Sequence, residues 1–383
     1  MSARQHARSR RGADAGFTLV EMLVAMTILL VVVGTVFSMV DPGHGISKAQ
    51  PEVADMQQRM RVAADVLQKD LIMAGAGTYS GSIAGALANF FPPIIPRRTG
   101  NLNPDPDMSF FDDRISIAYV PDTASQTDVR DTMPSTSAEV KVFAQPGCPV
   151  VTPMDNLCGF KEGMRVLVFD RTGAYDFFTI TQVQSTGTEG HLQHNETLNL
   201  DKNLSKAYSQ DDGARVAQVE THVYWLNRVT SQLQHYDGLG PSGDIPMVDN
   251  TVNLRFTYFG DPNPPLAPRP QAGSSNCIMD GGGNPLLPVL ASGGSSLVEL
   301  TPQMLSDGPP CGIAPNRFDA DLYRVRKVRV ELRVQAGLQE MRGQNPAGKT
   351  LFINPGSNTQ PYTRVPDYSM TFEVAPRNMN LVR

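Results

Sequence analysis

The sequence lacks the short motifs that mark the commonest catalytic sites. It has no Gly-x-Ser-x-Gly elbow, no phosphate-binding loop, no His-Glu-x-x-His pair and no dinucleotide fingerprint. The run Gly293-Gly294-Ser295-Ser296 is followed by no lysine, so we interpret it as a flexible loop. These absences predict a chain that is not an enzyme and that carries no cofactor.

Cysteine is scarce, and its spacing does not match the usual zinc sites. The four cysteines, Cys148, Cys158, Cys277 and Cys311, form no Cys-x-x-Cys pair and have no histidine close by. Four cysteines allow three disulfide pairings. We expect Cys148–Cys158 to close a short loop and Cys277–Cys311 to close a longer one, in an oxidising compartment.

Histidines and acidic clusters do not indicate a metal site. His191 and His194 lie in a segment that reads as strand or loop, where positions three apart face opposite ways. His222 and His235 read as an exposed pair across a hairpin. The acidic clusters lack the spacing of a calcium loop and read as solvated loop charge. They comprise Asp105, Asp107, Asp112 and Asp113 in one loop and Asp211-Asp212-Gly213 in another. We therefore expect no bound metal.

One apolar run near the start of the chain is the most informative feature that is present. Residues 17–40 contain a single ionisable side chain, Glu21. As a helix, these 24 residues would extend about 36 Å, which is enough to cross a hydrocarbon core of about 30 Å. A carboxylate in such a helix is unfavourable and usually has a partner.

A short basic leader precedes this run. Residues 1–16 contain four arginines and one aspartate, and such positive charge stays on the cytoplasmic side of a membrane. The apolar run ends without the small-residue cleavage site of a secretory signal. We expect cleavage to occur before the helix, which leaves 29 basic against 37 acidic residues, a net charge of −8. An acidic chain is a poor candidate for nucleic-acid binding.

The residues at the start of the run resemble a known processing site. The stretch Gly16-Phe17-Thr18-Leu19-Val20-Glu21-Met22, with its basic leader and apolar helix, resembles the prepilin motif of the type IV pilin and pseudopilin family. The resemblance implies that a prepilin peptidase cuts between Gly16 and Phe17 and methylates the new amine of Phe17. It also implies that Glu21 pairs with that amine on a neighbouring subunit during assembly.

An amphipathic helical segment follows the apolar run. Residues 41–45, which include Pro42 and two glycines, predict a bend or local melting. Apolar residues then recur at three- and four-residue steps; they are Val53, Met56, Met60, Ala63, Leu67, Leu71 and Ala74. We expect a long N-terminal helix whose part at 17–40 spans the membrane and whose continuation at 41–77 packs on a head.

From residue 78 to residue 383 the pattern predicts strands and turns. Short alternating or apolar segments bounded by turn residues indicate an antiparallel sheet, because no extended helical pattern interrupts them. The expected strands are 115–119, 140–142, 164–170 paired with 174–184, 216–226, 233–236, 252–259, 325–334 and 370–374. In residues 327–334 the apolar set should face the core and the basic set should face water or another subunit. The fold class is therefore α+β, with a β-rich head.

Two segments of the head do not follow the strand pattern. Residues 260–318 are rich in proline and glycine, and a loop of this length in a compact domain is usually functional or disordered. We expect a partly ordered surface insertion that is tethered by Cys277–Cys311. A smaller loop of the same kind covers residues 89–113.

The resemblance extends into the helix and narrows the expected function. Residues 55–75, from Asp55-Met56-Gln57-Gln58-Arg59 to Met73-Ala74-Gly75, are similar to the helix of PilW-type minor pilins and J-type secretion pseudopilins. This implies a minor pilin in few copies that primes or caps a type IV pilus. The alternatives are a J-type pseudopilin of type II secretion and, from another class, a membrane-anchored adhesin or binding domain.

The same resemblance implies a place in the cell and a set of partners. The expected location is the inner membrane, crossed once with the head in the periplasm, followed by the pilus after assembly. The expected partners are the prepilin peptidase, other pilins or pseudopilins bound through the N-terminal helix, and the membrane itself. No nucleic acid is expected.

Overall fold

A computed structural model of the chain describes most of its residues. These are residues 16–79, 84–100, 103–144, 159–185, 189–199, 202–238, 243–270, 273–290, 296–338, 341–342 and 365–380, without the side chains of 38–46, 48 and 185. The chain divides into two compact units, one of residues 1–53 with 338–366 and one of residues 54–337 with 367–383. We call the second unit the head and describe each unit by itself.

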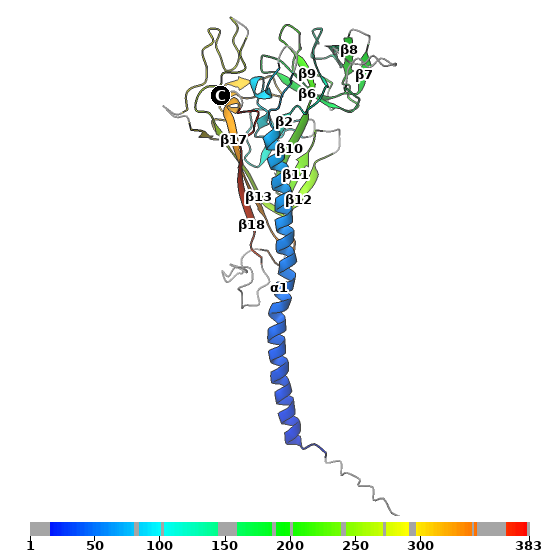
Figure 1. Cartoon of the computed structure of the whole chain (residues 1–383), viewed down its shortest axis with the longest axis vertical. Coiled ribbons are helices and arrows are strands. Elements are labelled where there is room, and N and C mark those ends of the chain that lie inside the picture. Colours follow the sequence, from blue (N-terminus) through cyan, green and yellow to red (C-terminus); the bar gives the residue numbers. More distant parts are fainter. Residues whose placement is uncertain are drawn as a thin grey trace, which may run out of the picture. The chain divides into compact units, whose positions relative to one another are not determined.

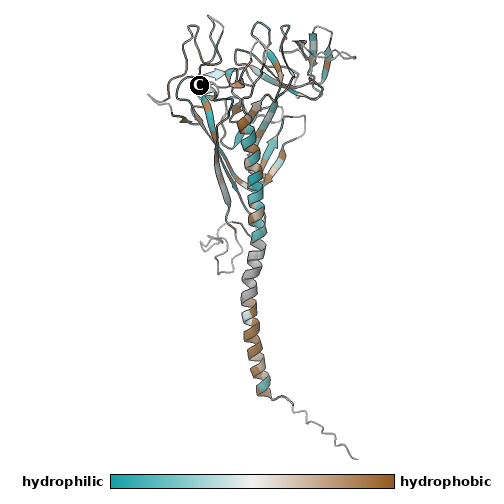
Figure 2. Cartoon of the chain, in the orientation of Figure 1, coloured by the Kyte–Doolittle hydropathy of each residue, from teal (hydrophilic) through white to brown (hydrophobic). Residues whose placement is uncertain are grey.

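A single long helix, α1 (Leu19–Met73), begins the described chain. Its N-terminal part is hydrophobic along its length, as Figure 2 shows. The backbone stays helical through residues 41–45, so local melting, one of the two predicted outcomes there, is wrong. An internal proline removes one backbone donor, and at Pro42 the flanking turns keep their helical conformation despite that loss.

The part of α1 that belongs to the head has the predicted buried stripe. Met56, Met60, Leu67 and Leu71 are at most 1% exposed, and Ala63 is fully buried. Beyond the helix, Gly75 has a positive φ of 81° and its N–H donates to the carbonyl of Ala118. Glycine adopts this conformation without steric cost, so the chain turns here from helix to sheet.

The rest of the head consists mainly of short strands, labelled in part in Figure 1. Those of the first half are β1 (Ile94–Ile95), β2 (Arg114–Tyr119), β3 (Gln126–Asp128), β4 (Glu139–Phe143), β5 (Arg165–Phe169), β6 (Tyr175–Thr179), β7 (Gln182–Ser185), β8 (Glu189–Gln193) and β9 (Arg215–Gln218). Those of the second half are β10 (Glu220–Asn227), β11 (Gln232–Tyr236), β12 (Ile245–Asp249), β13 (Thr251–Gly260), β14 (Val298–Leu300), β15 (Pro310–Cys311), β16 (Phe318–Asp319), β17 (Val325–Val334) and β18 (Tyr368–Val374). Two short 3₁₀ helices cover Leu87–Asn89 and Ala320–Arg324.

The strands form antiparallel sheets, as predicted. Two sheets have the orders β1-β2-β10-β11-β12 and β14-β13-β17-β18. Two further sheets, β3-β9-β5-β6 and β4-β8-β7, enclose a hydrophobic cluster that includes Val140, Val166, Phe178, Leu192 and Val216. The protein is therefore an α+β chain with an N-terminal apolar helix and a large, sheet-rich domain.

Two expected strands are each divided between two sheets. Residues 216–226 contain the end of β9 and most of β10, which separate at Val219 and pair with different partners. Residues 174–184 contain β6, which pairs with β5, and part of β7, which pairs with β8. Periodicity cannot reveal such a change of partner, because the alternation of side chains continues across it.

The described residues of the insertion at 260–318 include strands and buried side chains. Its strand β14 adds to the edge of β13, and Ile278, Leu287 and Leu300 are buried. The predicted disulfide Cys277–Cys311 is present, with the Cα atoms 5.2 Å apart. The other expected pair, Cys148–Cys158, lies outside the described residues.

The disulfide predicts a measurable stability difference. Cys277 and Cys311 are 34 residues apart in sequence, and closing a loop of this length stabilises a folded chain by roughly 3–4 kcal/mol in the chain-entropy view. Cys277→Ser and Cys311→Ser should each lower the free energy of unfolding of the head by this amount, measured with a denaturant. The double variant is the matched control and should resemble either single one. Unchanged unfolding in all three would contradict a structural role.

Candidate functional site

The residues of the expected cleavage site lie in an accessible segment ahead of α1. Gly16 and Phe17 are exposed, and the Phe17 side chain is 86% accessible. A Cβ atom added at Gly16 would meet no atom within 4 Å. Nothing in the described part of the chain therefore blocks the Gly16–Phe17 bond or requires glycine at this position for folding.

Thr18 and Glu21 close the start of the helix with reciprocal hydrogen bonds. The Glu21 carboxylate accepts from the Thr18 backbone N–H at 2.8 Å and from the Thr18 hydroxyl at 2.9 Å. The Glu21 N–H donates to the Thr18 hydroxyl oxygen at 3.3 Å. This is a capping box, in which Thr18 is the N-cap and Glu21 is the third helical residue. The Glu21 carboxylate therefore has a partner within its own chain.

The helix after this cap exposes a continuous apolar surface. Residues Leu19–Phe37 form the one described helical segment that is long and apolar enough to cross a membrane, with a mean hydropathy of 2.5. None of this segment is buried by the described chain. Even its least exposed large side chain, Val33, is 38% accessible. An apolar surface of this extent requires a cover of lipid or of other helices.

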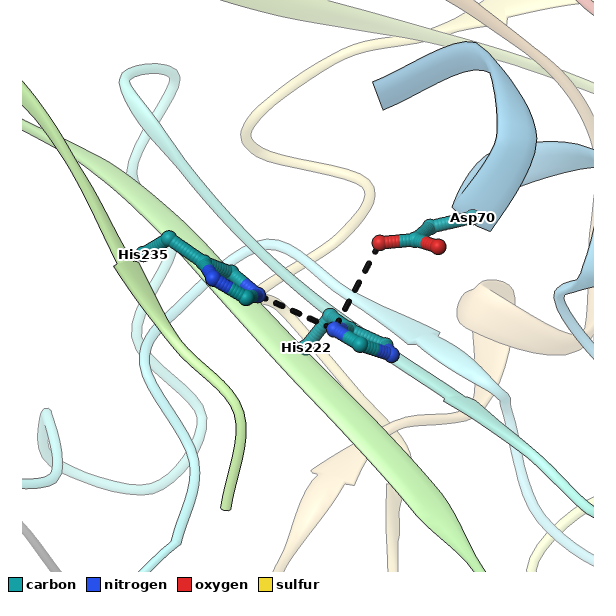
Figure 3. Close-up of side chains that lie close together, drawn as sticks. All are labelled: Asp70, His222 and His235. Carbon is teal, nitrogen blue, oxygen red and sulfur yellow. Dashed lines mark hydrogen bonds and ion pairs between the residues drawn. The ribbon is translucent and has the colours of Figure 1, made fainter. Parts of the chain in front are cut away.

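A second group of polar side chains lies inside the head. Figure 3 shows His222 of β10 and His235 of β11 side by side, with Asp70 of α1 pointing toward them. The His222 Nδ1 atom is 2.9 Å from the His235 Nε2 atom and 3.5 Å from an Asp70 oxygen. The Tyr224 hydroxyl donates to the same Asp70 oxygen. The sequence prediction of an exposed pair is wrong, because only 17% of the His222 side chain is accessible.

This group supplies three potential metal ligands within 4.8 Å of one another. The two imidazole rings are nearly coplanar, with an interplanar angle of 10°. Two nitrogens bound to one tetrahedral zinc ion would be about 3.3 Å apart, given Zn–N bonds of about 2.0–2.1 Å. The observed 2.9 Å is a hydrogen-bond distance. The pair is thus arranged to share a proton, and it links the end of α1 to the sheet.

The other histidine pair is separated as the strand pattern predicted. His191 lies on β8, and its Nδ1 atom is 2.7 Å from a carboxylate oxygen of Glu139. His194 follows the strand and is fully buried, with its ring 4.5 Å from that of Phe178. Burial lowers the pKa of His194 to about 4. The two histidines therefore have different surroundings and do not form one site.

The buried His194 predicts a pH-dependent loss of stability. Its pKa is near 6.5 when unfolded and about 4 in the fold, so the unfolded chain binds the extra proton between these values. The free energy of unfolding should then fall by about 3 kcal/mol relative to a His194→Leu variant as the pH drops from 6.5 to 4. Urea titrations of both proteins at several pH values measure the difference. Parallel curves across this range would contradict the assignment.

The acidic loop before β2 is paired with arginines, contrary to the solvated charge expected. Asp105 is 2.6 Å from Arg114 and 3.0 Å from Arg98, and Asp113 also pairs with Arg114, at 3.2 Å. Both aspartates are less than 10% exposed. In the second cluster, Asp212 lies 3.3 Å from the Lys206 ammonium group. Carboxylates that are paired with arginine or lysine side chains in this way are not arranged as a calcium-binding loop.

The basic face of β17 has the predicted orientation. Its apolar residues Val328, Val330 and Leu332 are buried, and the alternate positions are more accessible. Glu373 on β18 accepts from Lys327 and Arg329, each at 2.7 Å. The basic side chains are thus partly neutralised within the head.

Sequence reasoning missed the roles of Thr18 and Asp70 at these sites, and it also missed a buried arginine elsewhere in the head, Arg165. Thr18 could have been found, because Thr-x-x-Glu is the spacing of a capping box. Asp70 lay on the predicted buried stripe as a charged residue, which is a signal that a partner exists. Arg165 of β5 is 3% exposed and gave no local signal, because its neighbours come from distant parts of the chain.

Comparison with known proteins agrees with the geometry at the N-terminus. Residues 11–37 match the family model of the prokaryotic N-terminal methylation motif, a range that includes Gly16, Phe17 and Glu21. The chain is 28% identical over 163 residues to the pilin-like protein PilA3 of Thermus thermophilus. The alignment covers 40% of this chain and 64% of that relative. No solved structure matches the chain.

The methylation motif and the apolar helix lie together at the N-terminus. The methylation motif lies at the start of an exposed apolar helix that could span a membrane, and a large antiparallel domain follows it. The chain therefore carries a prokaryotic N-terminal methylation motif, and part of it is similar to a pilin-like protein.

Proposed function

We propose that this protein is a minor pilin of a type IV pilus, cleaved by prepilin peptidase between Gly16 and Phe17. The observation that carries the proposal is the methylation motif at residues 11–37, joined to an apolar helix that the described chain leaves uncovered. A helix of this kind is stable both in lipid and in a bundle of similar helices, since the two environments are equally apolar. Assembly is then the transfer of α1 from the membrane into a fibre.

Glu21 and the amine of Phe17 would set the axial position of the subunit. In a helix bundle, a carboxylate and an ammonium group are both unfavourable unless they are paired. Pairing Glu21 of one chain with the methylated amine of the next satisfies both charges at one register. The exposed position of both residues before α1 and in its first turn leaves them accessible to a neighbour.

The size of the head supports a role in few copies. The head contains residues 54–337 and 367–383, and a domain of this size is difficult to repeat at every position along a fibre. We place the subunit at a tip or in a complex that primes assembly. The head then lies in the periplasm before assembly and outside the cell afterwards.

The mass of the N-terminal peptide from membrane-extracted protein tests the proposal. We expect a peptide that begins at methylated Phe17, and its loss in cells that lack the prepilin peptidase. Sheared surface fibres should then contain the subunit at a low ratio to the main pilin. Recovery only with the secretion machinery would favour a J-type pseudopilin. An intact leader in both strains would leave a membrane-anchored binding domain.

A further inference from the structure

A pocket of about 600 Å³ lies within the head, among segments that are distant in sequence. Its walls come from the chain after β1, from β5 and β6, and from the loops around residues 203–205 and 314–316. Ligand sites in proteins commonly have volumes of about 300–1,000 Å³ and a few polar groups that fix the ligand. The charged groups of this wall therefore indicate what the pocket could hold.

Arg165 is the most unusual of these groups. Its side chain is 3% exposed, and its Nε and Nη1 atoms have no hydrogen-bond partner among the residues that the structure describes. No acidic side chain in the described part of the chain forms an ion pair with it; its guanidinium lies 5.6 Å from the ring centre of Phe177. Burial lowers the pKa of Arg165 to about 10, so it stays charged near neutral pH. A buried cation without a counter-charge is strongly unfavourable.

The carboxylates that line the pocket already have hydrogen bonds or ion pairs with residues other than Arg165. Asp176 accepts from the Ser205 N–H at 2.8 Å, from the Tyr208 hydroxyl at 2.9 Å and from the Asn316 amide at 2.6 Å. Asp105 pairs with Arg98 and Arg114, as described above. Asp107 pairs with Arg317 at 2.6 Å. None of these acids is directed to Arg165.

A second buried arginine increases the positive charge of the wall. Arg97 also lines the pocket, is 2% exposed and donates from Nη2 to the Arg317 carbonyl at 2.7 Å. A carbonyl satisfies one donor of a guanidinium but does not neutralise its charge. Near Arg165, Gly100 has a φ of 111°, and a Cβ there would be 3.8 Å from the Arg165 Nη2 atom. The lining thus holds two buried cations, and one of them, Arg165, lies close to Gly100.

We propose that this pocket binds a small oxyanion, a carboxylate, sulfate or phosphate group, through the Arg165 guanidinium. The planar guanidinium offers parallel N–H donors that match two oxygens of such a group. Binding supplies the missing counter-charge and hydrogen-bond acceptors at once. All residues that line the site belong to the head, whereas the processing motif belongs to the other unit, so we expect anion binding to be independent of cleavage.

The test is calorimetric titration of the full mature protein in detergent with sodium sulfate, sodium phosphate or sodium glutarate. Sodium chloride at matched ionic strength is the blank. We expect binding of at least one of the three anions, and the identity of that anion distinguishes a carboxylate ligand from a sulfate or phosphate ligand. Arg165→Met should weaken this binding by tenfold or more. Arg329→Met, which removes an equal charge from the exposed face of β17, should leave the affinity within twofold.

The stability of the same variants without anion provides an independent check. Removing an unpaired buried charge is neutral or stabilising, whereas removing one partner of a satisfied pair is destabilising. Arg165→Met should therefore melt at or above the temperature of the wild-type protein in chloride, and the added anion should raise the melting temperature of the wild type alone. If this variant fails to fold, Arg165→Lys can replace it, because lysine keeps the positive charge but lacks the parallel N–H donors of a guanidinium. Arg165→Lys should bind the anion more weakly than the wild type does.

Three results would overturn the proposal. In the first, the wild-type protein binds none of the three anions. In the second, the wild type and Arg165→Met bind an anion equally well. In the third, the melting temperature of Arg165→Met in chloride is much lower than that of the wild type. The third would mean that the fold already satisfies the guanidinium.

Discussion

Replacing Gly16 by alanine should lower prepilin processing by roughly 10–200-fold, the range by which one added methyl group changes reaction in a close-fitting site. The reason lies in the peptidase and not in this protein, since a Cβ at Gly16 would meet no atom within 4 Å. The variant should fold and insert normally. Pulse-chase labelling followed by mass analysis of the N-terminal peptide would measure the ratio of cleaved to uncleaved chains.

Ala15→Ser is a suitable control for this experiment, because it alters the preceding position by one atom and leaves Gly16 in place. It should be processed at the wild-type rate. Equal processing of Gly16→Ala and the wild type would remove the support for cleavage at this bond.

Loss of the Glu21 charge should leave cleavage intact and reduce incorporation into fibres by roughly tenfold or more, as expected when one partner of a buried charge pair is removed. Glu21→Gln and Glu21→Ala separate two effects. Glutamine can still accept hydrogen bonds from Thr18, as Glu21 does at 2.8 and 2.9 Å, but it has no charge. If the ion pair to the neighbouring amine matters, both variants should fail equally in sheared fibres.

Thr18→Val provides the complementary control. It removes the hydroxyl that accepts from the Glu21 N–H at 3.3 Å but retains the carboxylate. Its effect should be that of a lost cap, a modest destabilisation of the first turn. Normal assembly of Glu21→Gln together with failure of Thr18→Val would mean that Glu21 acts through the cap and not through its charge.

Local sequence patterns predicted helices and strands well where one face of the element is buried and its apolar residues recur at a regular spacing. The stripe from Met56 to Ala74 is buried as its spacing required, and β17 has the predicted bounds at residues 325–334. The same patterns failed at Val219, where the chain passes from β9 in one sheet to β10 in another. Alternation continues through that residue, so the exchange of partners depends on tertiary packing that the local sequence does not contain.

The site residues likewise fall into those that local sequence identifies and those that it does not. Gly16, Phe17 and Glu21 are adjacent in sequence, so one short motif identifies them. Asp70, His222 and His235 come from one helix and two strands. The 2.9 Å contact between the histidines requires β10 to pair with β11, and the 3.5 Å contact to Asp70 requires the sheet to pack on α1. Arg165 has no distinguishing neighbour in sequence. Its lack of a counter-charge is evident only when the surrounding segments are placed around it.

The capping box at the start of α1 has a consequence for how freely subunits exchange. While Thr18 holds the Glu21 carboxylate, an isolated subunit in the membrane already has hydrogen bonds for that charge. If the subunit enters a fibre as proposed, the amine of a neighbouring Phe17 replaces Thr18 as the partner of Glu21, and no charge without hydrogen bonds is rescued. This change of partners would then contribute less to the free energy of assembly than the pairing of an unbonded charge. Exchange of the subunit between membrane and fibre would accordingly be only weakly favoured in either direction.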